Sequence, residues 1–128
     1  MKKKDVLLVD DETPFVESLA EGLTAFHSEK LNVISTDNGK KAIEILRTVI
    51  IDVVVTDLKM PVMDGYELLD YLFLNHPDIP VIVMTAQDGA GVEQRLAKLN
   101  ITQYLEKPID FRAIACRILN IHKPVLSS

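Results

Sequence analysis

Short apolar runs alternate along this chain with longer segments of helical periodicity, and this alternation constrains the fold more than any other feature. The apolar runs occupy residues 6–9, 33–35, 53–55, 81–84 and 104–105. Strands that alternate with helices form parallel sheets, because each helix carries the chain back to the edge where the next strand begins. The sequence therefore predicts an α/β fold of five strand-helix units, with helices on both faces of one sheet.

The five runs differ in polarity. Residues 6–9, 53–55 and 81–84 are continuously apolar and mostly β-branched, as expected of strands that are covered on both faces. Residues 33–35 and 104–105 are more polar, so we expect these two strands at the edges of the sheet.

Apolar residues at helical spacing predict five helices, four of which have a start signal. The signals are Thr13-Pro14, Asn38, Asp64 with Glu67, and Asp110. The fourth helix, roughly 88–98, contains two glycines, and we expect it to be the element that moves most readily. The predicted core-facing residues are Phe15, Leu19, Leu23 and Phe26; Ala42, Ile45, Leu46 and Val49; Leu68, Leu69, Leu72 and Phe73; Val92, Leu96 and Leu99; and Phe111, Ile114, Ala115, Ile118 and Leu119.

Size and charge narrow the classes of function. With 128 residues, 48% of them hydrophobic, we expect one domain over residues 1–121 and a short tail over 122–128. The net charge of −5 argues against nucleic-acid binding, which needs a basic surface. No apolar run has the length of a signal peptide core or a membrane span, so we expect a cytoplasmic location. The single cysteine, Cys116, lies among apolar neighbours and is expected to be packed or half-packed.

Three carboxylates follow predicted strands. Asp10 and Asp11 come directly after the first strand, and Asp57 comes directly after the third. In a sheet of strand order 2-1-3-4-5, the order reverses between strands one and three, and ligands bind at the carboxyl ends of the strands there. Carboxylates brought together repel one another unless a cation is present. The pattern therefore predicts a Mg²⁺ site, because Mg²⁺ prefers oxygen ligands.

A hydroxyl and a cation are predicted at the same edge. Thr85 ends the fourth strand and Lys107 follows the fifth. A lysine ammonium pairs with carboxylates or phosphoryl oxygens, and a threonine hydroxyl donates a hydrogen bond to the same oxygens. This set of groups suits phosphoryl transfer, in which positioning and charge neutralisation supply most of the catalysis.

Together these motifs resemble the response-regulator receiver domain of two-component signalling, a CheY-like family, over residues 4–121. The resemblance matches an acidic pair, a phosphoacceptor, a switch hydroxyl, a switch aromatic and a Lys-Pro step; these are Asp10-Asp11, Asp57, Thr85-Ala86, Tyr104 and Lys107-Pro108. It implies a flavodoxin-like doubly wound sheet in the order 2-1-3-4-5. Tyr104 also has a plainer interpretation as an aromatic that packs at a sheet edge.

The resemblance implies a carboxylate nucleophile. Asp57 would accept a phosphoryl group from a sensor histidine kinase or a phosphotransfer protein. Mg²⁺ would be held by Asp11, Asp57 and the backbone carbonyl of Lys59, with Asp10 acting mainly through water. Lys107 would bind the phosphoryl group, and the peptide bond to Pro108 would be cis.

A conformational switch is implied as well. Thr85 would move toward the phosphate and Tyr104 would rotate inward, which changes the face made by residues 88–98, 104–105 and 111–121. That face would signal to a downstream protein or an effector domain, and the chain would be a monomer or a dimer that phosphorylation promotes through the same face. The chain would be a switch and not an enzyme, since it catalyses only its own phosphorylation and slow dephosphorylation.

Some residues depart from the family pattern. Many members have Gly-Ala where this chain has Leu99-Asn100, although asparagine tolerates the glycine conformation. Lys59 and Gln87 would flank the route of the attacking water and affect the lifetime of the phosphate.

Two other functions remain open. One is a Mg²⁺-dependent phosphatase or mutase with an aspartyl nucleophile, but such enzymes usually carry a second carboxylate two residues later, where this chain has Lys59. The other is a degenerate receiver that binds partners without phosphorylation. The presence of all the expected functional groups counts against it.

Overall fold

A computed structural model of the chain describes residues 3–58, 65–85, 90–99, 101 and 103–121. The strands are β1 (Lys4–Val9), β2 (Leu31–Thr36), β3 (Val53–Asp57), β4 (Val81–Thr85) and β5 (Gln103–Glu106). The helices are α1 (Thr13–His27), α2 (Gly39–Thr48), α3 (Gly65–Asn75), α4 (Ala90–Lys98) and α5 (Phe111–Asn120). Each strand extends past its apolar run by one or more residues, because main-chain pairing continues where side chains turn polar.

The strands form one parallel sheet in the order β2-β1-β3-β4-β5. This confirms the predicted flavodoxin-like topology, and it confirms that the two more polar strands lie at the edges. The order reverses between β1 and β3, which pair from Val6 opposite Val53 to Val9 opposite Thr56.

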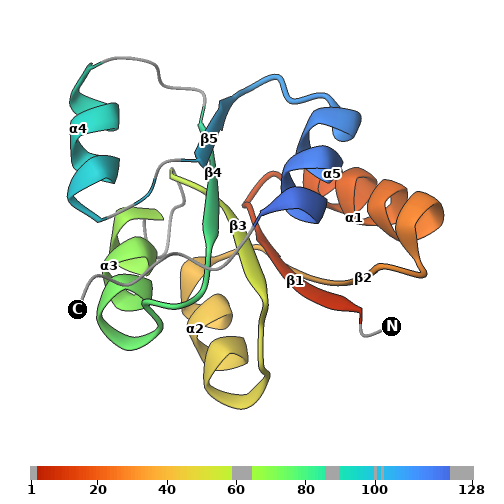
Figure 1. Cartoon of the computed structure of the whole chain (residues 1–128), viewed down its shortest axis with the longest axis horizontal. Helices are drawn as coiled ribbons and strands as arrows, with labels where there is room; N and C mark the ends of the chain where they lie inside the picture. The colour runs from red at the N-terminus through yellow and green to blue at the C-terminus, as the bar shows by residue number, and fades with distance from the viewer. Residues whose placement is uncertain (1–2, 59–64, 86–89, 100, 102, 122–128) are drawn as a thin grey trace.

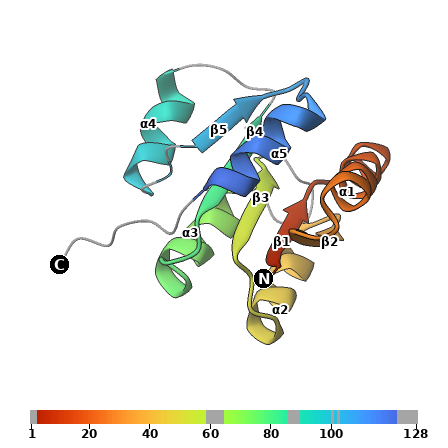
Figure 2. The ribbon, with the colours of Figure 1, turned by 45° about the vertical axis from the view of Figure 1, so that its right-hand side comes forward.

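Helices cover both faces of the sheet, with α1 and α5 on one side and α2, α3 and α4 on the other (Figures 1 and 2). Alternate residues of a strand point to opposite faces. In β1, Val6 and Leu8 therefore pack beneath α1 and α5, whereas Leu7 and Val9 pack beneath α2 and α3. The result is two buried apolar layers separated by the sheet.

Three predicted core residues are exposed. Phe26 is 74% exposed, although its ring lies against that of Phe111 in a tilted arrangement with the centroids 5.5 Å apart. Val49 follows the end of α2 and has extended backbone, so it leaves the helical stripe and is 38% exposed. Phe73 is 40% exposed because it lies one position after Leu72, about 100° around the helix from the buried stripe.

Two residues of α1 correct the sequence analysis. Val16, which was not among the predicted core residues, is buried with Leu19 and Leu23. Thr13 is the first helical residue and not the cap, since Glu12 precedes the helix without a side-chain capping bond.

The caps predicted for α2 and α5 are present. The side chain of Asn38 accepts a hydrogen bond from the Lys41 amide at 2.9 Å, and that of Asp110 accepts one from the Arg112 amide at 3.1 Å. The predicted cap Asp64 lies outside the described residues. Cys116 is exposed and not packed, because it faces solvent one position after the buried Ala115.

None of the helices that the structure describes is long and apolar enough to cross a membrane. The predicted tail, 122–128, lies outside the described residues.

Candidate functional site

The carboxyl ends of β1 and β3 bring three acidic side chains together. Carboxylate oxygens of Asp10, Asp11 and Asp57 all lie within 4.8 Å of one another. Asp10 is completely buried, Asp57 is 6% exposed and Asp11 is exposed. We call this group the acidic cluster. Its position is the one that the sequence predicted from the reversal of strand order.

The Lys107 side chain reaches the acidic cluster from the end of β5. Its ammonium donates to Asp10 Oδ2 at 2.8 Å, to Glu12 Oε1 at 3.0 Å and to Asp57 Oδ2 at 3.2 Å. The Lys107 amide also donates to the Thr85 carbonyl at 2.8 Å, and the Lys107–Pro108 peptide bond is cis. This backbone hydrogen bond joins the carboxyl ends of β4 and β5, from which the Lys107 side chain reaches the cluster.

Burial and charge shift the pKa values of two members of the site. Burial raises the pKa of Asp10 above 3.8, and the nearby Asp57 adds to this effect, although hydrogen bonds from Lys107 and the Glu12 amide oppose it. Burial lowers the pKa of Lys107, but the hydrogen bonds to Asp10 and Glu12 outweigh burial, so the net shift is upward. Lys107 is therefore a permanent cation at neutral pH.

Asp57 is fixed on one side by the backbone. Its Oδ1 accepts a hydrogen bond from the Leu58 amide at 2.7 Å, which leaves Oδ2 toward Lys107. The first residue of α3, Gly65, donates its amide to the Leu58 carbonyl at 2.7 Å. The start of α3 therefore rests on the backbone that follows Asp57.

The other predicted residues of the site occupy β4 and β5. Thr85 is 1% exposed at the end of β4. Tyr104 is half-buried on β5, and its hydroxyl donates a hydrogen bond to the carboxylate of Glu93 on α4. This hydrogen bond is the main cause that raises the pKa of Tyr104. Lys59 and Gln87 lie outside the described residues.

Glu12 is a member of the site that the sequence analysis missed. It is the third acidic residue in a row after β1, and that run was the available signal. Only the structure shows that its side chain reaches Lys107, which lies 95 positions away in the chain. Phe15 also approaches Lys107, with 5.0 Å between the ammonium and the ring centroid.

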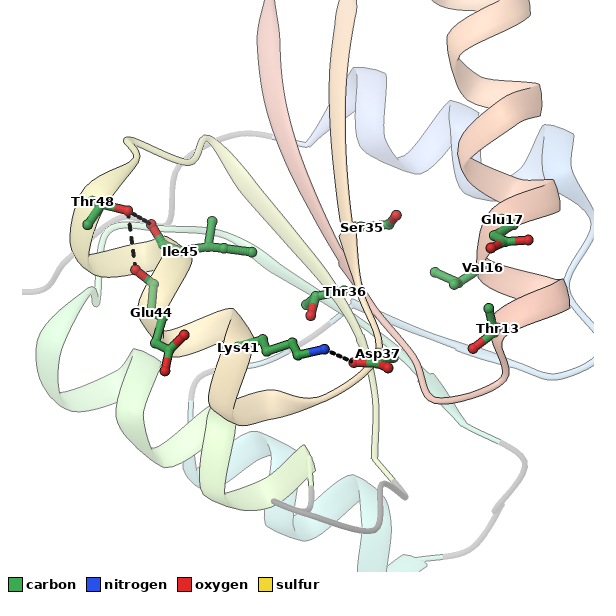
Figure 3. A pocket seen from close by; sticks show the side chains of 10 residues that line it. All are labelled: Thr13, Val16, Glu17, Ser35, Thr36, Asp37, Lys41, Glu44, Ile45 and Thr48. Atoms are coloured by element: carbon green, nitrogen blue, oxygen red, sulfur yellow. Dashed lines mark hydrogen bonds and ion pairs between the residues drawn. The ribbon is translucent and has the colours of Figure 1, made fainter.

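A groove of about 690 Å³ lies between α1, the end of β2 and α2 (Figure 3). An ion pair of 3.3 Å between Lys41 and Asp37 lies within it. None of the predicted site residues lines this groove. The groups suited to phosphoryl chemistry are thus gathered at the acidic cluster and not in this groove.

The donor set of the acidic cluster fits a hard divalent cation. All three side chains offer carboxylate oxygens, and their separation allows one ion to contact each of them. A cation would also offset the mutual repulsion that contributes to the raised pKa of Asp10.

Comparison with known proteins identifies a family over most of the chain. Residues 6–119 match the response regulator receiver domain. The receiver domain of the Francisella response regulator 1452 is a similar solved structure, with 27% identity and a TM-score of 0.76 over 91% of this chain and 93% of that one.

The curated relatives that this chain matches are longer proteins whose names describe different activities. The transcriptional regulatory protein ZraR of Klebsiella oxytoca is 34% identical over 107 residues, which cover 84% of this chain and 24% of ZraR. A probable cyclic di-GMP phosphodiesterase of Vibrio cholerae is 32% identical over 115 residues, which cover 88% of this chain and 25% of that protein. This chain therefore spans about a quarter of the length of these relatives.

Proposed function

This chain belongs to the response regulator receiver domain family of two-component systems, and on that premise we propose that it is switched by phosphorylation of Asp57. The observation that carries the proposal is the Asp57 carboxylate, held 3.2 Å from the Lys107 ammonium inside a cluster of three carboxylates. A nucleophile, a cation and a set of metal ligands meet there, as phosphoryl transfer requires.

The reaction would be an in-line displacement at phosphorus. An oxygen of Asp57 forms the new bond to phosphorus, while the bond from phosphorus to the imidazole nitrogen of a phosphohistidine breaks. The imidazole leaves with the electron pair of that bond and takes up a proton. Asp57 is suited to this role because its Oδ1 is anchored by the Leu58 amide, which fixes the direction of Oδ2.

Asp11 and Asp57 would hold Mg²⁺ together with the backbone carbonyl of Lys59, and Asp10 would act on the ion mainly through water. The ion would supply positive charge against the phosphoryl oxygens. Lys107 would supply a second positive charge, and its pairing with Asp10 keeps the ammonium over the cluster.

The output would pass through the face of α4, β5 and α5. Thr85 would donate its hydroxyl to the phosphoryl group, and Tyr104 would exchange its bond to Glu93 for a buried position behind Thr85. A change at Asp57 would thereby alter the position of α4.

The upstream partner would be a sensor histidine kinase or a phosphotransfer protein, and the downstream one a protein or an effector domain. We also propose that phosphorylation promotes dimers through the α4-β5-α5 face. Sedimentation velocity with and without beryllofluoride tests this, and an unchanged sedimentation coefficient would exclude it.

Intact-mass spectrometry after incubation with acetyl phosphate tests the central proposal. The protein should gain one phosphoryl group in the presence of Mg²⁺ and none in EDTA. Asp57→Asn should gain none, because its amide is not a nucleophile at neutral pH, whereas the exposed control Asp78→Asn should behave as the unmodified chain. Phosphoryl incorporation in Asp57→Asn, or no incorporation in the chain without substitutions, would contradict the proposal.

A further inference from the structure

Lys107 contacts three carboxylates that differ in their exposure to solvent. The side chain of Asp10 is 0% exposed, that of Asp57 is 8% exposed and that of Glu12 is 60% exposed. Asp10 and Asp57 belong to the acidic cluster, whereas Glu12 stands at the start of α1, at the outer rim. The free-energy cost of losing the bond to Lys107 therefore differs among the three carboxylates.

The donors of Lys107 are fully used by these contacts. An ammonium has three N–H groups, and three carboxylate oxygens lie within 3.2 Å of the nitrogen. A phosphoryl oxygen that binds Lys107 must therefore take the place of one carboxylate.

Glu12 is the carboxylate that costs least to displace. Removing the ammonium from Asp10 would leave a completely buried carboxylate oxygen without this partner, which is unfavourable. When Oδ2 of Asp57 bonds to phosphorus, the Lys107 donor that it held passes to the phosphoryl group, so a second donor for that group must come from Asp10 or Glu12. Glu12 is mostly exposed, so water can replace the ammonium as its partner, and the lost ion pair is weak.

Accordingly, we propose that Glu12 is a positioning residue that occupies the third donor of Lys107 at rest and yields it to the incoming phosphoryl group. This inference rests on the proposed function. Glu12 aims the ammonium at the cluster, but its charge also competes with the phosphoryl oxygens and repels them. It therefore sets how tightly the site takes up a phosphoryl anion.

A role for Glu12 in the start of α1 predicts a different result. Its backbone carbonyl accepts a hydrogen bond from the Val16 amide at 3.0 Å, but its side chain makes no capping bond. Replacement of the side chain by glutamine keeps that backbone bond. A purely structural side chain would change the free energy of unfolding and leave anion affinity unaltered.

Isothermal titration calorimetry of the full chain with beryllofluoride, at saturating Mg²⁺, tests the proposal. Glu12→Gln should bind beryllofluoride about two- to fivefold more tightly, the range expected when an exposed ion pair no longer competes. The matched control is Glu17→Gln, which removes the same charge from an exposed position of α1. Separate titrations with Mg²⁺ alone would correct for any change in metal affinity.

Kinetics give a second readout. With acetyl phosphate as donor, Glu12→Gln should lower the half-saturating concentration more than it changes the maximal rate, because the competition occurs when the anion binds. The control Glu17→Gln should change neither quantity.

The outcomes separate the two proposals. If the unmodified chain takes up neither beryllofluoride nor a phosphoryl group, the proposed function fails and the role of Glu12 falls with it. If the unmodified chain binds beryllofluoride but Glu12→Gln binds equally or more weakly, only the role of Glu12 is overturned. If Glu17→Gln strengthened beryllofluoride binding as much as Glu12→Gln does, the cause would be a general charge effect, and the role of Glu12 would also be overturned.

Discussion

Lys107 offsets part of the negative charge of the acidic cluster through its ion pairs with Asp10 and Asp57. Asp10 is completely buried, and a buried carboxylate is costly unless it is paired and hydrogen-bonded. Lys107 and the Glu12 amide supply those bonds at 2.8 and 2.9 Å. Even so, burial still raises the pKa of Asp10, so the pairing does not fully compensate for the loss of water. This residual cost has a measurable pH dependence.

We predict that Mg²⁺ stabilises the chain more at neutral pH than at acidic pH. Because the pKa of Asp10 is higher in the folded than in the unfolded state, the folded state binds more protons between pH 3.8 and the raised value. Stability from this group therefore falls as pH rises through that window, and the full cost of the ionised carboxylate is present above it. Mg²⁺ binding to the ionised cluster would offset that cost.

Differential scanning fluorimetry in Mg²⁺ and in EDTA, over a pH series, measures this effect. The increase in Tm caused by Mg²⁺ should shrink as pH falls through the raised pKa of Asp10, and Asp10→Asn should move that decline to lower pH. The prediction would be contradicted if the increase in Tm caused by Mg²⁺ stayed constant until the pH reached the ordinary pKa range of carboxyl groups.

At the scale of elements, α3 is positioned by direct backbone contact with the segment that carries Asp57. A Cβ atom at Gly65 would lie within 2.9 Å of Leu58 backbone atoms and would also overlap the Asp57 carbonyl. Backbone cannot move aside as a flexible side chain can. Gly65 is therefore required for space, because α3 begins in direct contact with the backbone of Asp57 and Leu58.

Gly65→Ala should lower the free energy of unfolding by about 1–3 kcal/mol, the usual cost of overpacking. The matched control is Gly22→Ala in α1, where the new Cβ would meet the Phe111 ring at 3.1 Å. Alanine also favours a helix interior over glycine by roughly 0.5–1 kcal/mol, so this change should be close to neutral. Urea denaturation of both variants gives the comparison, and equal losses would show that the close approach at Gly65 is not decisive.

Across the whole molecule, buried contacts are unevenly distributed among the helices. Among the described side chains, α1 buries Val16, Leu19 and Leu23, whereas α4 buries only Leu96. Polar contacts with neighbouring elements supplement this single buried side chain. Glu93 accepts the hydrogen bond from Tyr104 on β5, and Arg95 lies 3.6 Å from the ring centroid of Tyr66 on α3. Local stability follows such contacts, so α4 should open more readily than the sheet.

Hydrogen exchange measured by mass spectrometry should therefore be faster in α4 than in β1 and β3. Tyr104→Phe should speed exchange in α4 further, because it removes the bond to Glu93, and should leave β1 unchanged. Tyr71→Phe is the matched control, since the Tyr71 ring packs on His76, 5.7 Å away, at the end of α3. Slow exchange in α4, or no difference between the two variants, would contradict the prediction.

The order of the elements along the chain, the edge strands and the clustering of Asp10, Asp11 and Asp57 could all be predicted from the amino-acid sequence. These follow from local patterns, because apolar runs of strand length form buried strands and parallel strands end at the same edge. The caps Asn38 and Asp110 were equally predictable, since a capping side chain bonds only a few residues away.

Which side chains complete the site and the core depends on contacts between segments that are distant in the chain. The contact of Glu12 with Lys107 joins residues 95 positions apart, and no local pattern encodes such a pair. The exposure of Phe26 and Phe73 depended in the same way on where the neighbouring elements end, because a helical stripe is buried only where another element covers it. Spacing fixed the faces of these helices, and packing between distant segments fixed how much of each face was covered.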